Sequence, residues 1–207
     1  MQDILQYITM ITQNYCSTYR GNVNYEKYRH FEALLWNDIS FDKEWVRESL
    51  MCHVGHLPVI ASYLHQFCEH KDSIDLGRTL MMLAIHDIGE TIVWDVITVK
   101  NNRTLEESLA EDAAVKSLLN NEQYALYLEY TDPKTYAWKF AKSVDKLSGG
   151  IMLYASKPEV EKARYEHFWF DMTDLHNRYE WYMKRDSFLD DFFSCLMKEI
   201  NSQQSLI

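Results

Sequence analysis

Residues 80–95 read LMMLAIHDIGETIVWD, the most informative stretch of the chain. Six apolar residues lead into His86 and Asp87, and Glu90 and Asp95 follow within ten positions counted from the histidine. Acidic residues are rarely buried unless they are paired or bound to a metal ion. On a helix, Glu90 would lie one turn after His86, so the imidazole and carboxylate groups would address one point. This donor set suits a divalent transition ion, and further ligands must come from elsewhere in the chain.

His53 and Asp145 are the candidates for those further ligands. His53 lies 33 residues before His86, and Asp145 lies 58 residues after Asp87, each in a mainly apolar helical stretch. A lone histidine in such a stretch is also typical of a hydrogen-bonded core residue. A lone aspartate is also typical of a surface ion pair with a neighbouring lysine, so each residue taken singly has a structural interpretation.

Helical periodicity continues through almost the whole chain, and it predicts an all-α fold. The first two helices are expected from the apolar stripe at 4–15 and from Asn22 or Asn24 to about Trp36. The later helices are expected over about 42–67 with a bend near Gly55 to Pro58, behind an N-cap at Ser73, from Thr104 to about Leu119, from Asp132-Pro133 onward, from Pro158, and from about Arg178 to Ile200.

Three local patterns bear on where these helices begin, weaken or give way to a strand. Thr104 and Glu107 have the spacing of a capping box, which satisfies backbone donors at a helix start. Gly149-Gly150 either weakens its helix or permits close packing against a neighbour. The β-branched segment Thr91–Val99 is the one candidate strand in the chain.

Length and charge narrow the class of protein. The 207 residues, with a mass of 24.7 kDa, suit one domain that needs no disulfide or metal merely to fold. The chain has 21 basic and 31 acidic residues, a formal net charge of −10. Such a body repels phosphate backbones, so long nucleic acid is an unsuitable partner. A small phosphate ligand is still compatible where the charge inverts locally.

Cysteine usage and hydropathy indicate a cytoplasmic location. No two of the four cysteines form a CxxC pair, and their spacing suggests no disulfide framework. The first 16 residues carry an early Asp3 and regularly spaced polar residues, unlike a signal or transit peptide. No run of about 18 apolar residues occurs, so no membrane span is expected.

Taken in order, His53, His86-Asp87 and Asp145 resemble the H…HD…D pattern of the HD-domain superfamily of metal-dependent phosphohydrolases. The likeness is to a branch of 5'-deoxynucleotidases, and it covers roughly residues 30–160. That branch has the stretches E-S-x-x-x-H, H-D-x-x-E-x-x-x-x-D and V/A-K-x-x-D. They are matched here by residues 48–53, 86–95 and 141–145.

The resemblance implies a fold, a cofactor and roles for the matched residues. The fold would be a single all-α HD bundle over 1–207, with a core at about 30–160 and flanking helices at 1–29 and 161–207, often found as a homodimer. One divalent ion (Mn, Co, Mg, Fe, Ni or Zn) would be held by His53, His86, Asp87 and Asp145. Glu90 would transfer a proton to or from the attacking water, and Asp95 would support catalysis or contact the sugar.

Two points about the ligand set follow from the histidines. No histidine lies between Asp87 and Asp145, where dinuclear HD proteins resemble one another in carrying extra ones, and this favours a single ion. His56 lies one helical turn from His53 and is an alternative first ligand. The E-S-x-x-x-H register favours His53.

The predicted substrate is a small nucleotide, with a 5'-deoxyribonucleoside monophosphate as the best candidate. A nucleoside triphosphate hydrolase and a non-catalytic HD module that binds a nucleotide or a protein are the alternatives. Lys142 is a candidate for binding phosphate, or else a surface partner of Asp145. Trp94, where the branch usually has Gly, would narrow the pocket, stack on a base or join the core. Trp36 follows Leu35 rather than Arg, so Arg29 or Arg47 would substitute.

Overall fold

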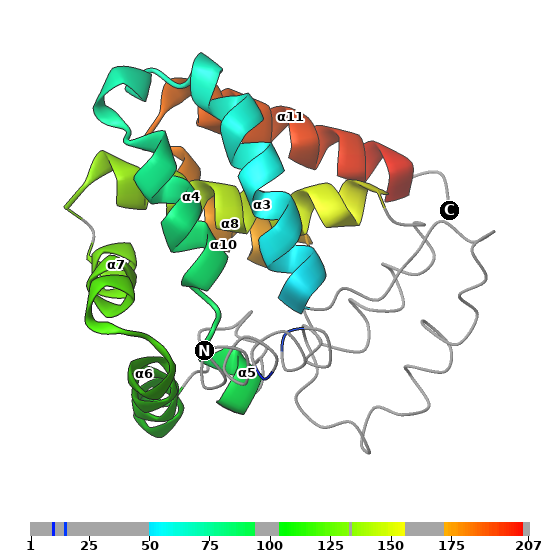
Figure 1. Ribbon diagram of the computed structural model, residues 1–207. Coiled ribbons are helices and arrows are strands. Elements are labelled where there is room, and N and C mark those ends of the chain that lie inside the picture. Colours follow the sequence, from blue (N-terminus) through cyan, green and yellow to red (C-terminus); the bar gives the residue numbers. More distant parts are fainter. Residues whose placement is uncertain are drawn as a thin grey trace, which may run out of the picture.

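The computed structural model describes Met10, Tyr15 and residues 50–93, 104–132, 134–155 and 172–204. Every regular element among these residues is a helix, which confirms the predicted all-α class (Figure 1). Several predictions lie outside the described residues. They are the second helix, the first helix apart from Met10 and Tyr15, the segment that begins at Pro158, and the roles of Trp36, Arg47, Trp94 and Asp95. The candidate strand at Thr91–Val99 is wrong where it is described, because Thr91–Val93 belong to a helix.

The described chain contains eight α-helices and two short 3-10 helices. The 3-10 helices are η1 (His65–Phe67) and η2 (Lys71–Ser73). The α-helices are α3 (Leu50–Leu64), α4 (Leu76–Ile85), α5 (Glu90–Val93), α6 (Leu105–Leu118), α7 (Asn121–Thr131), α8 (Tyr136–Ala155), α10 (Met172–Met183) and α11 (Ser187–Gln204).

Helix α8 is the centre of the described fold. It packs against α3, α4, α7, α10 and α11, as Figure 1 shows. Its residues Val144 and Leu147 are fully buried and join one core cluster with Leu57 of α3, Met82 of α4 and Phe193 of α11. Burial of such apolar side chains is the main stabilising term of the fold.

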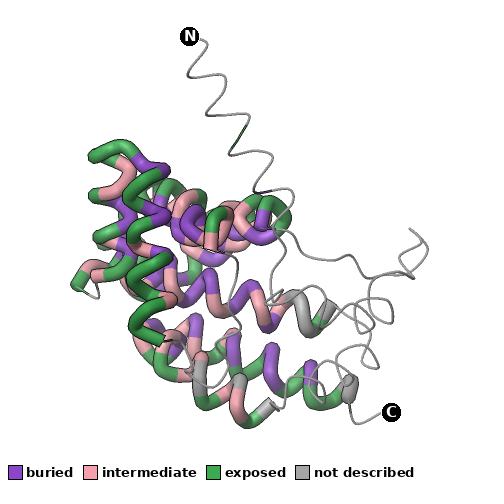
Figure 2. Tube along the Cα trace, turned by 90° about the horizontal axis from the view of Figure 1, so that it is seen from below, coloured by how far each residue is buried: buried purple, intermediate pink, exposed green. Residues whose placement is uncertain are grey.

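A second, smaller cluster joins the start of α3 to the region of α5, α6 and α7. Leu50, Ile88 and Val115 lie at its centre, and Tyr15 packs with them. Figure 2 shows the buried residues on the sides where helices face one another and the exposed residues on the outer sides. The segment between α4 and α5 is therefore held between two apolar clusters.

The helix starts agree only in part with the predictions. The capping box of Thr104 and Glu107 is present at the start of α6, as predicted. Ser73 caps no α-helix: it ends η2, and Asp75 caps α4 by accepting a hydrogen bond from the Arg78 amide. The prediction at Ser73 is wrong because the chain makes one more 3-10 turn before α4 begins.

Two further boundaries also differ from the predictions. Asp132 lies at the end of α7 rather than at the start of the next helix, and α8 begins at Tyr136 behind Thr135, whose hydroxyl accepts from the Trp138 amide. The expected last helix is two helices, α10 and α11. Asp186 separates them, because its carboxylate accepts hydrogen bonds from the Phe188 and Leu189 amides and so starts α11.

Positions that were expected to bend or weaken helices lie inside continuous helices. Helix α3 continues through both Gly55 and Pro58. Helix α8 continues through Gly149-Gly150, and a Cβ on Gly150 would lie 3.0 Å from Leu196 of α11, so close helix packing is the better interpretation. Among the described helices, none combines the length and the apolar character that crossing a bilayer requires.

Candidate metal centre

Three helices bring the predicted ligands to one place. His53 comes from α3 and Asp145 from the middle of α8. His86 follows the last residue of α4, and Asp87 lies in the turn between α4 and α5. A continuous helix through His86 and Glu90 was expected, and this is wrong: α4 ends at Ile85 and α5 begins at Glu90.

Gly89 explains why the chain turns there. A Cβ on Gly89 would lie 2.8 Å from the Glu111 Cγ and 2.8 Å from the Val115 Cγ2, both on α6. The turn is closed by a hydrogen bond from the Glu90 amide to the Asp87 carbonyl (3.0 Å). Close contact with α6 thus requires a residue without a side chain and sets the direction in which Asp87 leaves the helix.

The donor atoms of the four residues lie within a few ångströms of one another. His53 Nε2 is 3.4 Å from Asp87 Oδ2 and 3.5 Å from Asp145 Oδ1. His86 Nε2 is 3.2 Å from Asp87 Oδ1 and 3.7 Å from Asp145 Oδ1. Donor atoms of His53, His86 and Asp145 all lie within 4.8 Å of one another, and all three residues are buried.

These separations are those of ligands around a single ion. An ion with bonds of about 2.1 Å holds tetrahedral ligands about 3.4 Å apart and adjacent octahedral ligands about 3.0 Å apart. The four nitrogen–oxygen separations, 3.2 to 3.7 Å, lie on both sides of the tetrahedral value. Imidazole nitrogen with carboxylate oxygen is a donor set that first-row divalent ions accept.

The histidine at position 86 is oriented for such a role. Its Nδ1 lies 2.8 Å from the Leu83 carbonyl oxygen, which accepts only, so Nδ1 carries the proton and Nε2 faces the other donors. Nε2 is buried and has no hydrogen-bond partner of good geometry. The carboxylates of Asp87 and Asp145 approach this nitrogen at 3.2 and 3.7 Å, and an ion among these donors would satisfy it with better geometry.

The two carboxylate oxygens of Asp145 have different partners. Its Oδ1 faces the two histidines. Its Oδ2 accepts hydrogen bonds from the Tyr130 hydroxyl (3.0 Å) and from the Lys146 ammonium (2.8 Å). Burial alone would raise the pKa of Asp145, but Lys146 and the two histidines hold it well below its usual range. Asp145 is therefore ionised and fixed in orientation.

Comparisons with known proteins agree with this geometry. The sequence model of the HD domain family matches residues 39–182, more than half of the chain. The chain belongs to the HD domain family. A predicted metal-dependent phosphohydrolase from Magnetospirillum magnetotacticum has a similar structure, with a TM-score of 0.69 over 96% of this chain and 94% of that chain. At 17% identity this likeness concerns the fold alone.

Two curated relatives match only about half of this HD domain chain. The 5'-deoxynucleotidase HDDC2 of Mus musculus is 27% identical over 119 residues, which cover 54% of this chain and 56% of that protein. The Homo sapiens protein of the same name is 27% identical over 119 residues, 54% of this chain and 55% of its own length. The matched segment thus spans about half the length of these relatives.

The remaining predicted residues that the structure describes are His56, Lys142 and Glu90. His53 rather than His56 is the histidine of α3 whose Nε2 lies near Asp87 and Asp145, and it belongs to the group of donors within 4.8 Å, so the geometry favours His53 as the first ligand. Lys142 lies with its Nζ 3.7 Å from the centre of the Tyr130 ring, and Lys146 rather than Lys142 pairs with Asp145. Glu90 begins α5, directly after the turn.

Sequence reasoning missed one supporting residue of this site. Tyr130 is buried, donates to Asp145, and has its ring 5.1 Å from that of His86. It lies at the end of α7, fifteen residues before Asp145. Nothing in its local sequence distinguishes it from the neighbouring tyrosines 124 and 127, because its role depends on how α7 packs against α8.

Proposed function

We propose that the chain is a metal-dependent phosphohydrolase that acts on small nucleotides. The observation that carries the proposal is the meeting of His53 from α3, His86 and Asp87 from the turn after α4, and Asp145 from α8, at distances suited to one divalent ion. A site that only stabilised the fold would not need Glu90 beside it.

These four residues would hold the ion, with Asp145 supported by Tyr130 and Lys146. When bound, a divalent ion polarises a phosphoryl oxygen and lowers the pKa of a coordinated water. The buried imidazoles and carboxylates keep the donor set fixed, so little reorganisation accompanies each turnover. Asp87 is the most exposed of the four, and its side chain marks the side from which substrate enters.

Glu90 is the proposed general acid and base. Its backbone is tied to that of Asp87, which keeps it next to the ligand turn. A carboxylate so placed would accept a proton from the attacking water and return one to the leaving oxygen. Asp95 is proposed to support this step or to contact the sugar.

The proposed substrate is a 5'-deoxyribonucleoside monophosphate. Support comes from the name of the curated relatives, 5'-deoxynucleotidase, and from their identity of 27% over about half of each chain. A net charge of −10 leaves the ion and nearby lysines as the attraction for phosphate. Lys142, stacked on Tyr130 beside Asp145, is the proposed lysine, and Trp36, Arg47 and Trp94 stay predicted contacts.

The test is phosphate release from deoxyribonucleoside and ribonucleoside mono- and triphosphates, each with Mn²⁺, Co²⁺, Mg²⁺ or chelator. Release from the deoxyribonucleoside monophosphates, abolished by chelator and by Asp145→Asn, is expected. Asp112→Asn is the matched control, because Asp112 also accepts a bond from a tyrosine hydroxyl, that of Tyr124, outside the site. Its activity should match the parent protein.

Other outcomes of this experiment would favour the alternative functions. Preferential release from triphosphates would replace the monophosphate proposal with a triphosphate hydrolase. No release from any nucleotide by metal-loaded protein would contradict the proposed hydrolase and favour a binding module. The homodimer, the cytoplasmic location and the lack of long nucleic acid partners stay predictions.

A further inference from the structure

Lys146 places a positive charge in direct contact with a metal ligand. Its ammonium donates a hydrogen bond to Asp145 Oδ2 at 2.8 Å, and the two residues are neighbours on α8. The Tyr130 hydroxyl donates to the same oxygen at 3.0 Å. Both donors hold the oxygen that does not face the histidines, so Asp145 Oδ1 is the oxygen presented to an ion.

The surroundings of Lys146 make its charge effective at the site. The Lys146 side chain is only 23% exposed, and Asp145 is buried. Water therefore screens the ammonium less than it screens a lysine on the open surface, and charges at short range interact more strongly. Lys142 differs from Lys146, because its ammonium lies over the Tyr130 ring at 3.7 Å rather than at hydrogen-bond distance from a ligand oxygen.

The charges of the ligand set show what Lys146 adds. The carboxylates of Asp87 and Asp145 supply two negative charges, the imidazoles bind an ion in their neutral form, and a divalent ion cancels the carboxylates. Glu90, the proposed general acid and base, adds a further negative charge when it is ionised. The loaded centre would then be negative, and it would repel a phosphate group. The ammonium of Lys146 offsets that charge.

We propose that Lys146 sets the charge of the loaded metal centre: it weakens binding of the ion and strengthens binding of a phosphate group. The two effects have opposite signs because an ammonium repels a cation and attracts an anion. Neither effect requires contact with the substrate, so Lys146 is a positioning residue that acts through Asp145 and through its charge. The inference rests on the proposed function, because it requires a divalent ion at the four ligands.

A purely structural role for Lys146 would give the opposite result for the ion. A lysine that only oriented Asp145 would resemble Tyr130, and its loss would lower ion affinity, as loss of an outer partner of a ligand usually does. Removal of a positive charge should raise ion affinity instead. The sign of the change in ion affinity therefore separates the two roles.

The test measures two affinities of the full chain by isothermal titration calorimetry at about pH 7.5. The first is Mn²⁺ with the chelator-treated protein, and the second is inorganic phosphate with the Mn²⁺-loaded protein. Lys146→Gln removes the charge and keeps a hydrogen-bond donor. We expect it to bind Mn²⁺ about three- to tenfold more tightly and phosphate about tenfold more weakly than the parent protein. Lys146→Arg keeps the charge and should keep both affinities.

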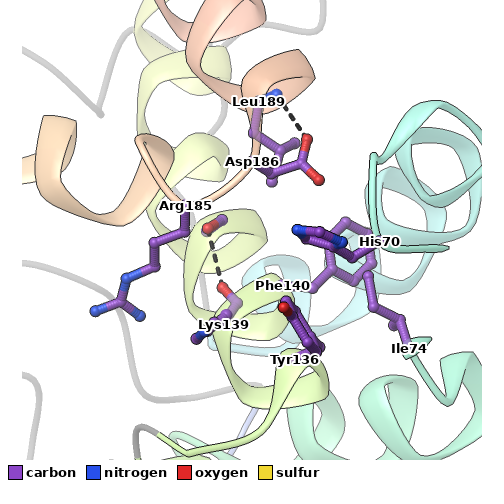
Figure 3. A pocket seen from close by; sticks show the side chains of 9 residues that line it. His70, Ile74, Tyr136, Lys139, Phe140, Arg185, Asp186 and Leu189 are labelled. Atoms are coloured by element: carbon purple, nitrogen blue, oxygen red, sulfur yellow. Dashed lines mark hydrogen bonds between the residues drawn. The ribbon is translucent and has the colours of Figure 1, made fainter.

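Lys139→Gln is the matched control, since it removes the same charge from the same helix. Lys139 lies two turns before Lys146, about 10 Å along the helix axis. Its ammonium lies 4.6 Å from the centre of the Tyr136 ring. Figure 3 shows Lys139 and Tyr136 beside Arg185, at a small pocket whose lining includes none of the four ligands. Both affinities of Lys139→Gln should match those of the parent protein.

Three outcomes overturn the inference. They are weaker Mn²⁺ binding in Lys146→Gln, phosphate binding that does not change in Lys146→Gln, and equal changes in Lys139→Gln and Lys146→Gln. If Lys146→Gln unfolds, as judged by its thermal midpoint, Lys146→Ala decides the test, because water can then bond to Asp145.

Failure of this inference differs from failure of the proposed function. A parent protein that hydrolyses nucleotides, with both affinities unchanged in Lys146→Gln, contradicts the inference alone. A parent protein that binds Mn²⁺ and phosphate but hydrolyses no nucleotide contradicts the proposed function, and the two affinities still decide the role of Lys146. A parent protein that binds no Mn²⁺ overturns both.

Discussion

The charged groups on two faces of α8 differ in whether they have partners of opposite charge. On one face, Asp145 is buried among partners: two histidines lie near one oxygen, and Tyr130 and Lys146 donate hydrogen bonds to the other. On the other face, Arg185 is stacked between aromatic rings without a carboxylate partner in the described structure. A buried charge with internal partners can form a permanent site. Arg185, by contrast, is only partly buried and lies against aromatic rings.

The largest expected effect separates chemistry from ion binding on the first face. Glu90→Ala should lower turnover about 10²- to 10⁴-fold, because it removes a general acid and base without removing a ligand. Mn²⁺ affinity, measured by isothermal titration calorimetry, should stay unchanged. Glu180→Ala on α10, where the carboxylate pairs with Lys184, is the control that should keep full activity. Near-normal rates in Glu90→Ala would show that the assigned role is wrong.

The second prediction concerns the pH dependence of ion binding at the metal centre. Burial opposes charge on His86, but Asp87 and Asp145 outweigh it and raise its pKa to about 9 in the ion-free protein. An ion that binds Nε2 must displace that proton, so Mn²⁺ affinity should rise about tenfold per pH unit from about 7 to 9 and then level off.

Calorimetry at several pH values in buffers of different ionisation enthalpy checks this expectation by counting the protons released. About one proton per ion is expected at pH 7. Mn²⁺ affinity that does not change between about pH 7 and 9 would contradict the assignment of His86 as a ligand.

The next prediction concerns the hydrogen bond from Tyr130 that supports Asp145. Tyr130→Phe removes the hydroxyl that donates to Asp145 and keeps the ring that lies under Lys142. Loss of such an outer partner typically lowers metal affinity about 10- to 100-fold. Tyr124→Phe, which removes a hydroxyl bonded to Asp112 on α6, is the matched control and should leave Mn²⁺ affinity unchanged.

A merely structural Tyr130 would give a different pattern. In that case Tyr130→Phe and Tyr124→Phe would lower the thermal midpoint to similar extents and leave metal affinity alone. The absorption spectrum of bound Co²⁺ provides a second readout, because it responds to the geometry around the ion rather than to global stability.

His86 and Asp87 could be singled out from sequence because they are neighbours, whereas His53 and Asp145 were joined to them by the resemblance to the HD domain. The pairs His86-Asp87 and Thr104 with Glu107 depend on neighbouring residues only, and the described geometry at both agrees with that reading. Tyr130 and the cap at Asp186 depend on contacts between distant helices, which periodicity does not encode. The turn after His86 was missed because apolar periodicity continues across it, while its cause, contact of Gly89 with α6, is tertiary.

Gly89 offers the smallest expected effect and tests how closely the metal face is packed. In Gly89→Ala the added methyl would meet Glu111 and Val115 of α6 at 2.8 Å, so overpacking should cost about 1–3 kcal/mol of unfolding free energy in chemical denaturation. Gly55→Ala is the control, since a Cβ there meets nothing within 4 Å and a helical alanine should be neutral or stabilising. The Gly89→Ala turn must shift to relieve the contact, and Asp87 shifts with it. A loss of Mn²⁺ affinity in Gly89→Ala that does not occur in Gly55→Ala would show that the turn after His86 positions the metal ligands. Equal stability of the two alanine variants would mean that α6 does not hold the turn.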